Sequence, residues 1–206
     1  MLTPGGPAGR FAAGDGWSLP TRCGSIARPR TDRAAMDETV SDETLFIPGA
    51  ETKRAFRDAL GRFATGVTVV TTLGPQGPVG VTANSFAALS LDPPLVLWAP
   101  AKTSRRCSVF VEARAFAVHV LAEDQLALSR HFTQPDDHFA GLPTSTSPEG
   151  TPLLEGTLAR FECLHEAAHD AGDHVIVIGR VLRARFRKGR PLVFSQGAYG
   201  SFTALP

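Results

Sequence analysis

Residues 80–96, GVTANSFAALSLDPPLV, place a polar cluster between two apolar runs. The segment begins like a β-strand, passes through the small residues Thr82, Ala83, Asn84 and Ser85, and becomes apolar again after a Pro-Pro pair. Buried polar groups need hydrogen-bond partners, so a plain core has little use for this cluster. If the cluster ends a strand, its side chains and free backbone groups face a neighbouring cleft. The stretch therefore predicts a polar rim that can bind the edge of a flat ring rich in nitrogen and oxygen.

The prolines at 93 and 94 favour an extended, rigid backbone, which holds Ser90 and Leu91 in fixed positions. A second cluster follows in AKTSRRCSVF, residues 101–110. Lys102 and either Arg105 or Arg106 flank a predicted helix start that Thr103 or Ser104 caps. Free amides, the helix dipole and a cation together favour the binding of an anion, and a phosphate group is the expected ligand. An ordinary capped helix with surface basic residues explains the segment equally well on its own, but the adjacent polar rim favours the anion site.

Hydrophobic periodicity predicts a mainly β domain with few helices. We expect strands at 67–73, from 79, at 95–99, 116–121, 158–165, 174–186 and 191–194, and helices from 56 to Gly66, at 104–113 and at 123–132. Residues 133–156 are expected to form a long loop. The turn residues GPQGP at 74–78 predict a hairpin and hence antiparallel pairing. About six or seven such strands usually close into a barrel or a sandwich.

The first 50 residues differ from the rest of the chain. They contain seven Gly and five Pro among scattered charges, with no sustained apolar period. Such a segment buries too little apolar surface to offset its ordering entropy, so we expect residues 1–50 to be a disordered extension and 51–206 to be the folded domain. Met36 is an alternative translation start, and a targeting peptide is a weaker alternative.

Composition narrows the possible partners and compartments. The net charge is +1, which gives no basic excess for nucleic acid, and no run of 18 apolar residues suggests a membrane span. Three cysteines, Cys23, Cys107 and Cys163, form no C-x-x-C pair, so neither a disulfide framework nor a thiolate zinc site is indicated. We therefore expect a cytoplasmic protein that binds neither nucleic acid nor a membrane.

The stretch HEAAH at 165–169 matches the zinc-protease pattern, with His165 and His169 as ligands and Glu166 as general base. Its context favours another interpretation, because the residues before it alternate like a strand and Gly172 follows closely. We expect a hairpin turn with exposed histidines and no metal site. A zinc hydrolase is kept as the weaker alternative.

Four motifs together resemble the flavin reductase-like family, which includes the small reductase components of two-component flavin monooxygenases. They are TGVTVVTT at 65–72, the opening stretch, GDHVIVIGRV at 172–181 and PLVFSQGAYGSF at 191–202. The resemblance covers about residues 54–202 in the expected order. It implies an antiparallel split β-barrel that binds FMN or FAD, usually as a homodimer.

The resemblance also implies roles for individual residues. Thr82, Ala83, Asn84 and Ser85 would line the flavin ring and ribityl chain, and Ser90 and Leu91 would continue that wall. Lys102, Thr103 and Ser104 match the segment that holds the phosphate. Gly172, Asp173 and His174 match the mouth where the nicotinamide approaches, and Tyr199 lies in the C-terminal motif near the flavin.

The implied reaction transfers hydride from NADH or NADPH to FMN or FAD, and reduced flavin then serves a partner monooxygenase. Positioning can supply ~7–11 kcal/mol of such a barrier, and the cofactor carries the chemistry. His174 is the candidate catalytic residue, orienting the dinucleotide or stabilising charge at the flavin edge; alternatively it only hydrogen-bonds its own turn. A flavin-holding electron-transfer or redox-sensing module is the main rival function.

Overall fold

The computed structural model describes residues 43–134 and 139–205. Residues 43–50 form no helix or strand, and the rest of the predicted extension, including Met36, lies outside the described residues. Its disorder and the alternative start therefore stay predictions. Leu45–Pro206 forms a compact unit.

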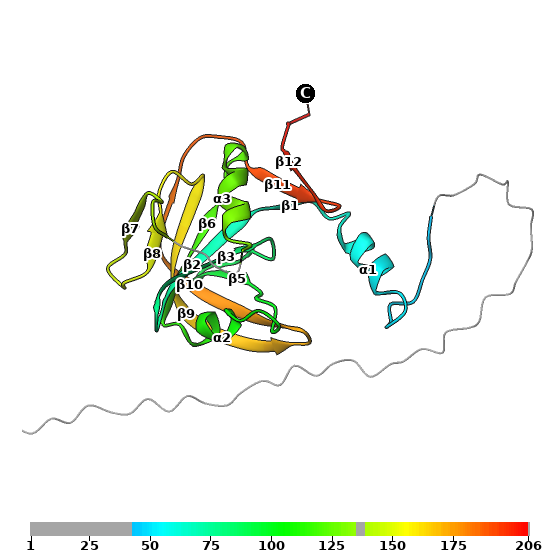
Figure 1. Ribbon diagram of the computed structural model, residues 1–206, viewed down its shortest axis with the longest axis horizontal. Helices are drawn as coiled ribbons and strands as arrows, with labels where there is room; N and C mark the ends of the chain where they lie inside the picture. Colours follow the sequence, from blue (N-terminus) through cyan, green and yellow to red (C-terminus); the bar gives the residue numbers. More distant parts are fainter. Residues whose placement is uncertain (1–42, 135–138, 206) are drawn as a thin grey trace, which may run out of the picture. The chain divides into compact units, whose positions relative to one another are not determined.

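Antiparallel strands dominate this unit (Figure 1). Across the largest sheet the order is β3 (Gly77–Ala83), β2 (Thr68–Gly74), β6 (Ala115–Val120), β9 (Ala159–Ala171), β10 (His174–Phe186), β5 (Pro94–Trp98) and β4 (Ala87–Leu91). A second sheet holds β1 (Thr65–Gly66), β11 (Leu192–Ser195) and β12 (Ala198–Ser201), and a third pairs β7 (Thr144–Thr146) with β8 (Pro152–Leu154). Every strand pair in the described chain is antiparallel, which confirms the predicted class.

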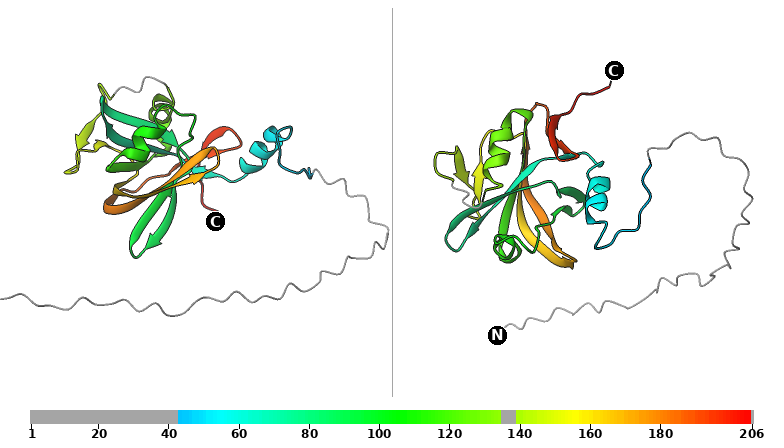
Figure 2. Two further views of the ribbon diagram at one scale, coloured as in Figure 1. Left: turned by 90° about the horizontal axis from the view of Figure 1, so that it is seen from below. Right: turned by 45° about the vertical axis from the view of Figure 1, so that its right-hand side comes forward.

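The long β9–β10 hairpin lies in the interior of the largest sheet (Figure 2). The two strands are 13 residues each and pair from His174 opposite Ala171 to Phe186 opposite Ala159. Register shifts after Ile178 and after Val181 interrupt the ladder. Such bulges increase the local twist of a sheet. The tip of this hairpin carries His174 at the first position of β10.

The helices are α1 (Lys53–Leu60), α2 (Cys107–Glu112), the 3-10 turn η1 (Glu123–Gln125) and α3 (Leu126–His131). Figure 1 shows α1 standing outside the sheets, and none of its residues is buried. The β11–β12 turn holds its C-terminal end, since the Gln196 amide donates to Gly61 O at 2.9 Å and Arg62 Nη1 donates to Gln196 Oε1 at 2.7 Å. None of the helices in the described ranges has the length and hydropathy needed to cross a bilayer.

Two apolar clusters form the core. The first gathers Val70, Trp98, Phe110, Phe116 and Val177 from four strands and α2, and the Trp98 and Phe110 rings meet edge to face at 5.0 Å. The second contains Val67, Val69, Leu121, Phe132, Leu154 and Leu192. Complete burial of side chains of this size contributes roughly 1.5–3 kcal/mol each. The first cluster matters for function because it forms the floor of a cavity.

Several predicted elements differ from the observed ones. The first helix ends at Leu60 with Gly61 as its cap, well before Gly66. The second helix starts at Cys107, not Ser104, because residues 101–106 form consecutive turns, with Ser104 N donating to Ala101 O and Cys107 N to Ser104 O. Its N-cap is Arg106, which makes no side-chain cap bond, so the predicted Thr103 or Ser104 cap was wrong.

Short strands account for the other differences. The predicted loop at 133–156 contains the β7–β8 hairpin, and β4 occupies Ala87–Leu91 where a connection was expected. The HEAAH stretch belongs to β9, so the prediction of a turn there was wrong; the turn lies at Gly172 and Asp173. Each of these strands pairs with the next strand along the chain, β4 with β5, β7 with β8 and β9 with β10, so hairpin pairing rather than the local residue pattern defines them.

Candidate functional site

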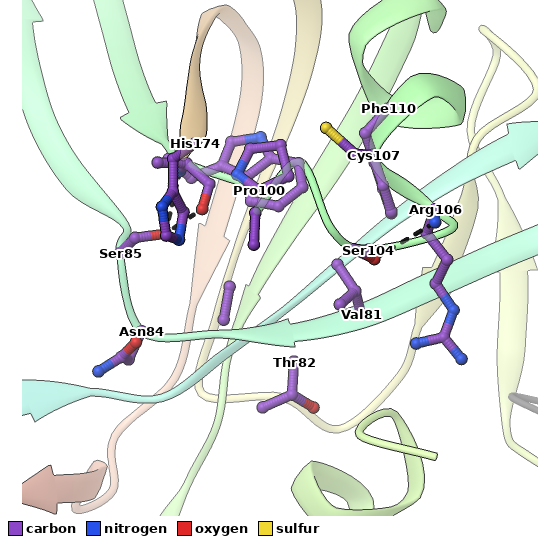
Figure 3. Close-up of a pocket in the computed structure, with 14 residues that line it drawn as sticks. Val81, Thr82, Asn84, Ser85, Pro100, Ser104, Arg106, Cys107, Phe110 and His174 are labelled. Carbon is purple, nitrogen blue, oxygen red and sulfur yellow. Dashed lines mark hydrogen bonds between the residues drawn. The ribbon is translucent and has the colours of Figure 1, made fainter. Parts of the chain in front are cut away.

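A cavity of about 230 Å³ opens between the ends of β3, β5 and α2 and the start of β10. Val81, Trp98 and Phe110 give it apolar walls, and Asn84, Ser104 and His174 add polar groups. In Figure 3, His174 and Ser85 lie at one end of the cavity and Ser104 and Arg106 at the other. An apolar slot with a few polar groups at its ends suits a flat heteroaromatic ring with a polar extension.

The predicted rim at 82–85 lines this cavity, and its polar side chains differ in their hydrogen bonding. Thr82 Oγ1 donates to Ser129 O of α3 at 2.6 Å, and the Ser85 hydroxyl both donates to Ala99 O at 3.1 Å and accepts from Ala99 N at 3.0 Å. These two hydroxyls therefore hold the rim in place. Asn84 is exposed, and its side chain forms no hydrogen bond in the described part of the chain. Its amide is the group that can both donate to and accept from a ligand.

Ser104 and Arg106 line the far end of the cavity. Ser104 Oγ accepts from Arg106 N at 3.3 Å, as the dashed line in Figure 3 marks. The Arg106 guanidinium donates to Phe132 O at 3.4 Å and to Gln134 O. The guanidinium is thus held by these carbonyl oxygens, and the Ser104 hydroxyl is the group at this end that suits a phosphate oxygen.

Lys102 and Thr103 are not among the cavity-lining residues. The ammonium of Lys102 instead pairs with Asp170 Oδ2 on β9 at 2.5 Å. Of the three residues predicted for phosphate binding, the structure thus places only Ser104 at the cavity.

His174 reaches the cavity from the tip of the β9–β10 hairpin. Its Nδ1 lies 2.7 Å from Asp173 Oδ1, and this contact holds the pKa of the Asp173 carboxyl below its ordinary value. An ionised carboxylate only accepts hydrogen bonds, so Nδ1 carries the proton and Nε2 remains for another partner. Gly172 takes φ +68° in the turn, a backbone conformation that favours glycine.

Tyr199 lies at an adjoining cavity of about 120 Å³, which shares Thr82, Ala83 and Asn84 with the first. Its hydroxyl lies 3.2 Å from Ser129 Oγ. Ser90 and Leu91 lie on β4, outside both cavities, and Leu91 is 97% exposed. Gly172 and Asp173 do not line the cavity themselves; they precede His174, which does.

Sequence reasoning missed the cavity floor. Trp98, Phe110 and Cys107 line it, and Trp98 is 1% exposed with an indole Nε1 that has no hydrogen-bond partner among the described residues. Residues 94–98, PLVLW, are apolar throughout, so the sequence did not show which side chains of β5 face the cavity; the structure places Val96 and Trp98 on the buried face.

The HEAAH residues do not form a metal centre in the described chain. His165 and His169 lie four residues apart on strand β9, about 13 Å at the usual strand rise. Glu166 accepts two bonds from Arg180, at 2.9 and 2.7 Å, and this pairing lowers the pKa of the Glu166 carboxyl. No group of three or more potential metal ligands occurs among the residues that the structure describes.

The model of the flavin reductase like domain matches residues 60–203, which is most of the chain. The protein belongs to this family. The match begins six residues later than the predicted resemblance and ends one residue beyond it.

Two curated relatives are similar to this chain over most of their own length. An FMN reductase (NADH), SmoA, from Agrobacterium fabrum is 57% identical over 162 residues, covering 79% of this chain and 93% of the relative. The reductase subunit HsaB of a flavin-dependent monooxygenase from Rhodococcus jostii is 44% identical over 166 residues, covering 80% and 85%.

Solved structures resemble the fold of this family member. Nitrilotriacetate monooxygenase component B from Mycobacterium thermoresistibile has a TM-score of 0.70 and 43% identity, covering 75% of this chain and 89% of that one. The NADH:FAD oxidoreductase SgcE6 from Streptomyces globisporus, in complex with NAD and FAD fragments, has a TM-score of 0.70 and 35% identity, covering 77% and 98%. These neighbours confirm the predicted split-barrel fold.

Proposed function

We propose that this protein is an NAD(P)H-dependent flavin reductase that supplies reduced flavin to a partner monooxygenase. The observation that carries the proposal is the 57% identity to an FMN reductase (NADH) over 93% of that relative. NADH and FMN are therefore the first pair of substrates to test, with FAD as the alternative flavin.

The residues that line the cavity suit a flavin by their chemistry. The Asn84 side-chain amide offers a donor and an acceptor for the ring edge, the apolar residues Trp98 and Phe110 form the floor, and the Ser104 hydroxyl suits the phosphate end. A bound flavin would supply the redox chemistry, because its ring can take up the hydride that a nicotinamide gives up. Thr82 and Ser85 keep the rim rigid through their bonds to Ser129 and Ala99. Catalysis then depends mainly on positioning, which can contribute ~7–11 kcal/mol.

His174 is assigned to the nicotinamide side of the cavity. Asp173 fixes its Nδ1–H, so Nε2 can accept a hydrogen bond from the dinucleotide or orient it. Asp173 and Gly172 shape this turn, and Tyr199 borders the flavin from the adjoining cavity. Ser90 and Leu91 lie on β4 outside both cavities, so they have no role in this proposal.

The named relatives suggest a partner protein, and the exposed apolar residues of α1 suggest an oligomeric state. HsaB is named as a reductase subunit of a flavin-dependent monooxygenase, and an oxygenase of this type is the partner we propose. A homodimer is proposed because the apolar residues of α1 are exposed in the single chain. The cytoplasm is the expected compartment, since the described cysteines, Cys107 and Cys163, are free thiols.

A direct assay tests the reaction. The purified protein mixed with NADH and FMN should oxidise NADH, seen as loss of its near-ultraviolet absorbance, only when flavin is present. Riboflavin should be a poorer acceptor if the phosphate end contributes to binding. A yellow protein that retains flavin yet oxidises neither NADH nor NADPH would favour an electron-transfer module instead.

A further inference from the structure

The tip of the β9–β10 hairpin is tied to the cavity wall at residues 99–102. The Val175 amide donates to Pro100 O at 3.1 Å, and the Lys102 amide donates to Asp173 O at 2.9 Å. Ala101 and His174 form an isolated antiparallel bridge between these two bonds. The position of His174 relative to the cavity therefore depends on how firmly the tip holds this wall.

Lys102 holds both sides of the tip. Its backbone amide binds the turn at Asp173, and its Nζ lies 2.5 Å from Asp170 Oδ2 on the opposite strand, where Asp170 faces Val175 in register. The hydrogen bond from Lys102, together with its positive charge, holds the pKa of the Asp170 carboxyl below its ordinary value. The two side chains are 38% and 78% exposed, so the pair lies at the surface beside the cavity.

We infer that Lys102 is a positioning residue: by pairing with Asp170 it clamps the hairpin tip onto the cavity wall and fixes His174 where the nicotinamide approaches. This inference rests on the proposed function for the role of His174. An exposed ion pair adds little to overall stability. Its effect should therefore appear in the geometry of the tip rather than in the folding of the domain.

Lys102→Met tests the clamp. We expect KM for NADH to rise by about twofold to fivefold, the range of a single exposed ion pair, with kcat, the melting temperature and the FMN-to-riboflavin affinity ratio unchanged. Asp170→Asn should have the same effect. The charge swap Lys102→Asp with Asp170→Lys should restore most of the loss, because it rebuilds the pair in reverse.

Arg180→Met is the matched control. Arg180 and Glu166 form an exposed ion pair of similar length, 2.7 Å, on the same hairpin but outside the cavity lining. Loss of that pair should leave KM for NADH unchanged. Ser104→Ala gives the contrasting pattern, a weaker affinity for FMN with little change for riboflavin.

A readout independent of activity separates this inference from the proposed function. Amide hydrogen exchange at Val175 should accelerate in Lys102→Met by about the same factor as the KM change, and the swap should reverse it. If the wild-type protein oxidises no NADH, the proposed function fails whatever the exchange shows. If the wild type is active, an unchanged KM for NADH, with or without faster exchange, overturns the positioning role. A Lys102→Met loss confined to FMN overturns it as well and makes Lys102 a phosphate ligand.

Discussion

His174 is the residue whose replacement best separates nicotinamide binding from flavin binding. It enters the cavity from β10, whereas Asn84 comes from the end of β3 and Ser104 and Arg106 come from the loop before α2. We expect His174→Ala to lower kcat/KM for NADH by roughly twofold to tenfold, as for a hydrogen bond between neutral groups worth ~0.5–1.5 kcal/mol, while flavin affinity changes little. Steady-state kinetics with varied NADH, together with a flavin titration, measure both.

His169→Ala is the control, because His169 is exposed on the neighbouring strand β9. It should leave both constants unchanged. Equal losses for NADH and flavin in His174→Ala would place His174 at the flavin instead. Loss of activity and of bound zinc in His169→Ala would revive the hydrolase alternative.

Reasoning from the residue pattern alone predicted the site only where neighbours in sequence are neighbours in space; His174 and Tyr199 came from the family resemblance. Thr82 to Ser85 form one rim because a strand ends there, and their small polar side chains marked it. The Lys102–Asp170 pair joins residues 68 positions apart, so no local spacing could reveal it. The role of Trp98 in the cavity was not predicted for another reason. A tryptophan in a strand usually belongs to the core, and here Trp98 belongs to the core and also lines the cavity.

At the scale of elements, a buried histidine joins three strands. His119 of β6 is fully buried, its Nδ1–H donates to Val69 O of β2 at 3.1 Å, and its Nε2 accepts from Leu154 N of β8 at 3.0 Å. Burial lowers the pKa of His119 from 6.5 to about 3. The imidazole thus stays neutral in the folded protein at any pH at which the enzyme would act.

This histidine predicts a loss of stability in mild acid. Between pH 6.5 and about 3 the unfolded chain binds a proton at His119 and the folded chain does not, so protonation favours unfolding. The free energy of unfolding should fall by up to about 1.4 kcal/mol per pH unit in this window. Urea denaturation at several pH values measures the slope. His119→Gln should be less stable near neutrality but show a shallower slope, whereas the slope of His169→Gln should match wild type; equal slopes in all three proteins would contradict the assignment.

Elements with a strong local signal were predicted, and elements defined by their partners were not. The turn residues after β2 predicted the β2–β3 hairpin, and the β-branched run from His174 predicted β10 over its observed length. Strands β1, β7 and β12 have only two to four residues each. Strands this short carry too few alternating positions to be distinguished from loops.

At the scale of the whole molecule, α1 exposes apolar surface that a second copy would cover. Phe56 and Leu60 on α1 and Phe63 just after it are 43%, 59% and 79% exposed, and no residue of α1 is buried. The helical spacing that predicted an amphipathic helix is present, yet its apolar side meets no core in the single chain. A contiguous exposed apolar patch usually marks an interaction site, and homo-oligomers with twofold symmetry are the commonest assemblies.

Light scattering should therefore give the molar mass of a dimer. The double change Phe56→Ser with Leu60→Ser should shift the protein toward monomer at micromolar concentration, because the patch loses the apolar area that drives association. It should also remove the concentration dependence of the melting temperature that a dimer shows. Leu73→Ser, at an exposed leucine on β2, is the matched control and should remain dimeric. A wild-type protein that stays monomeric at every concentration would refute the role of α1, because its apolar side would then be open to solvent in the active molecule.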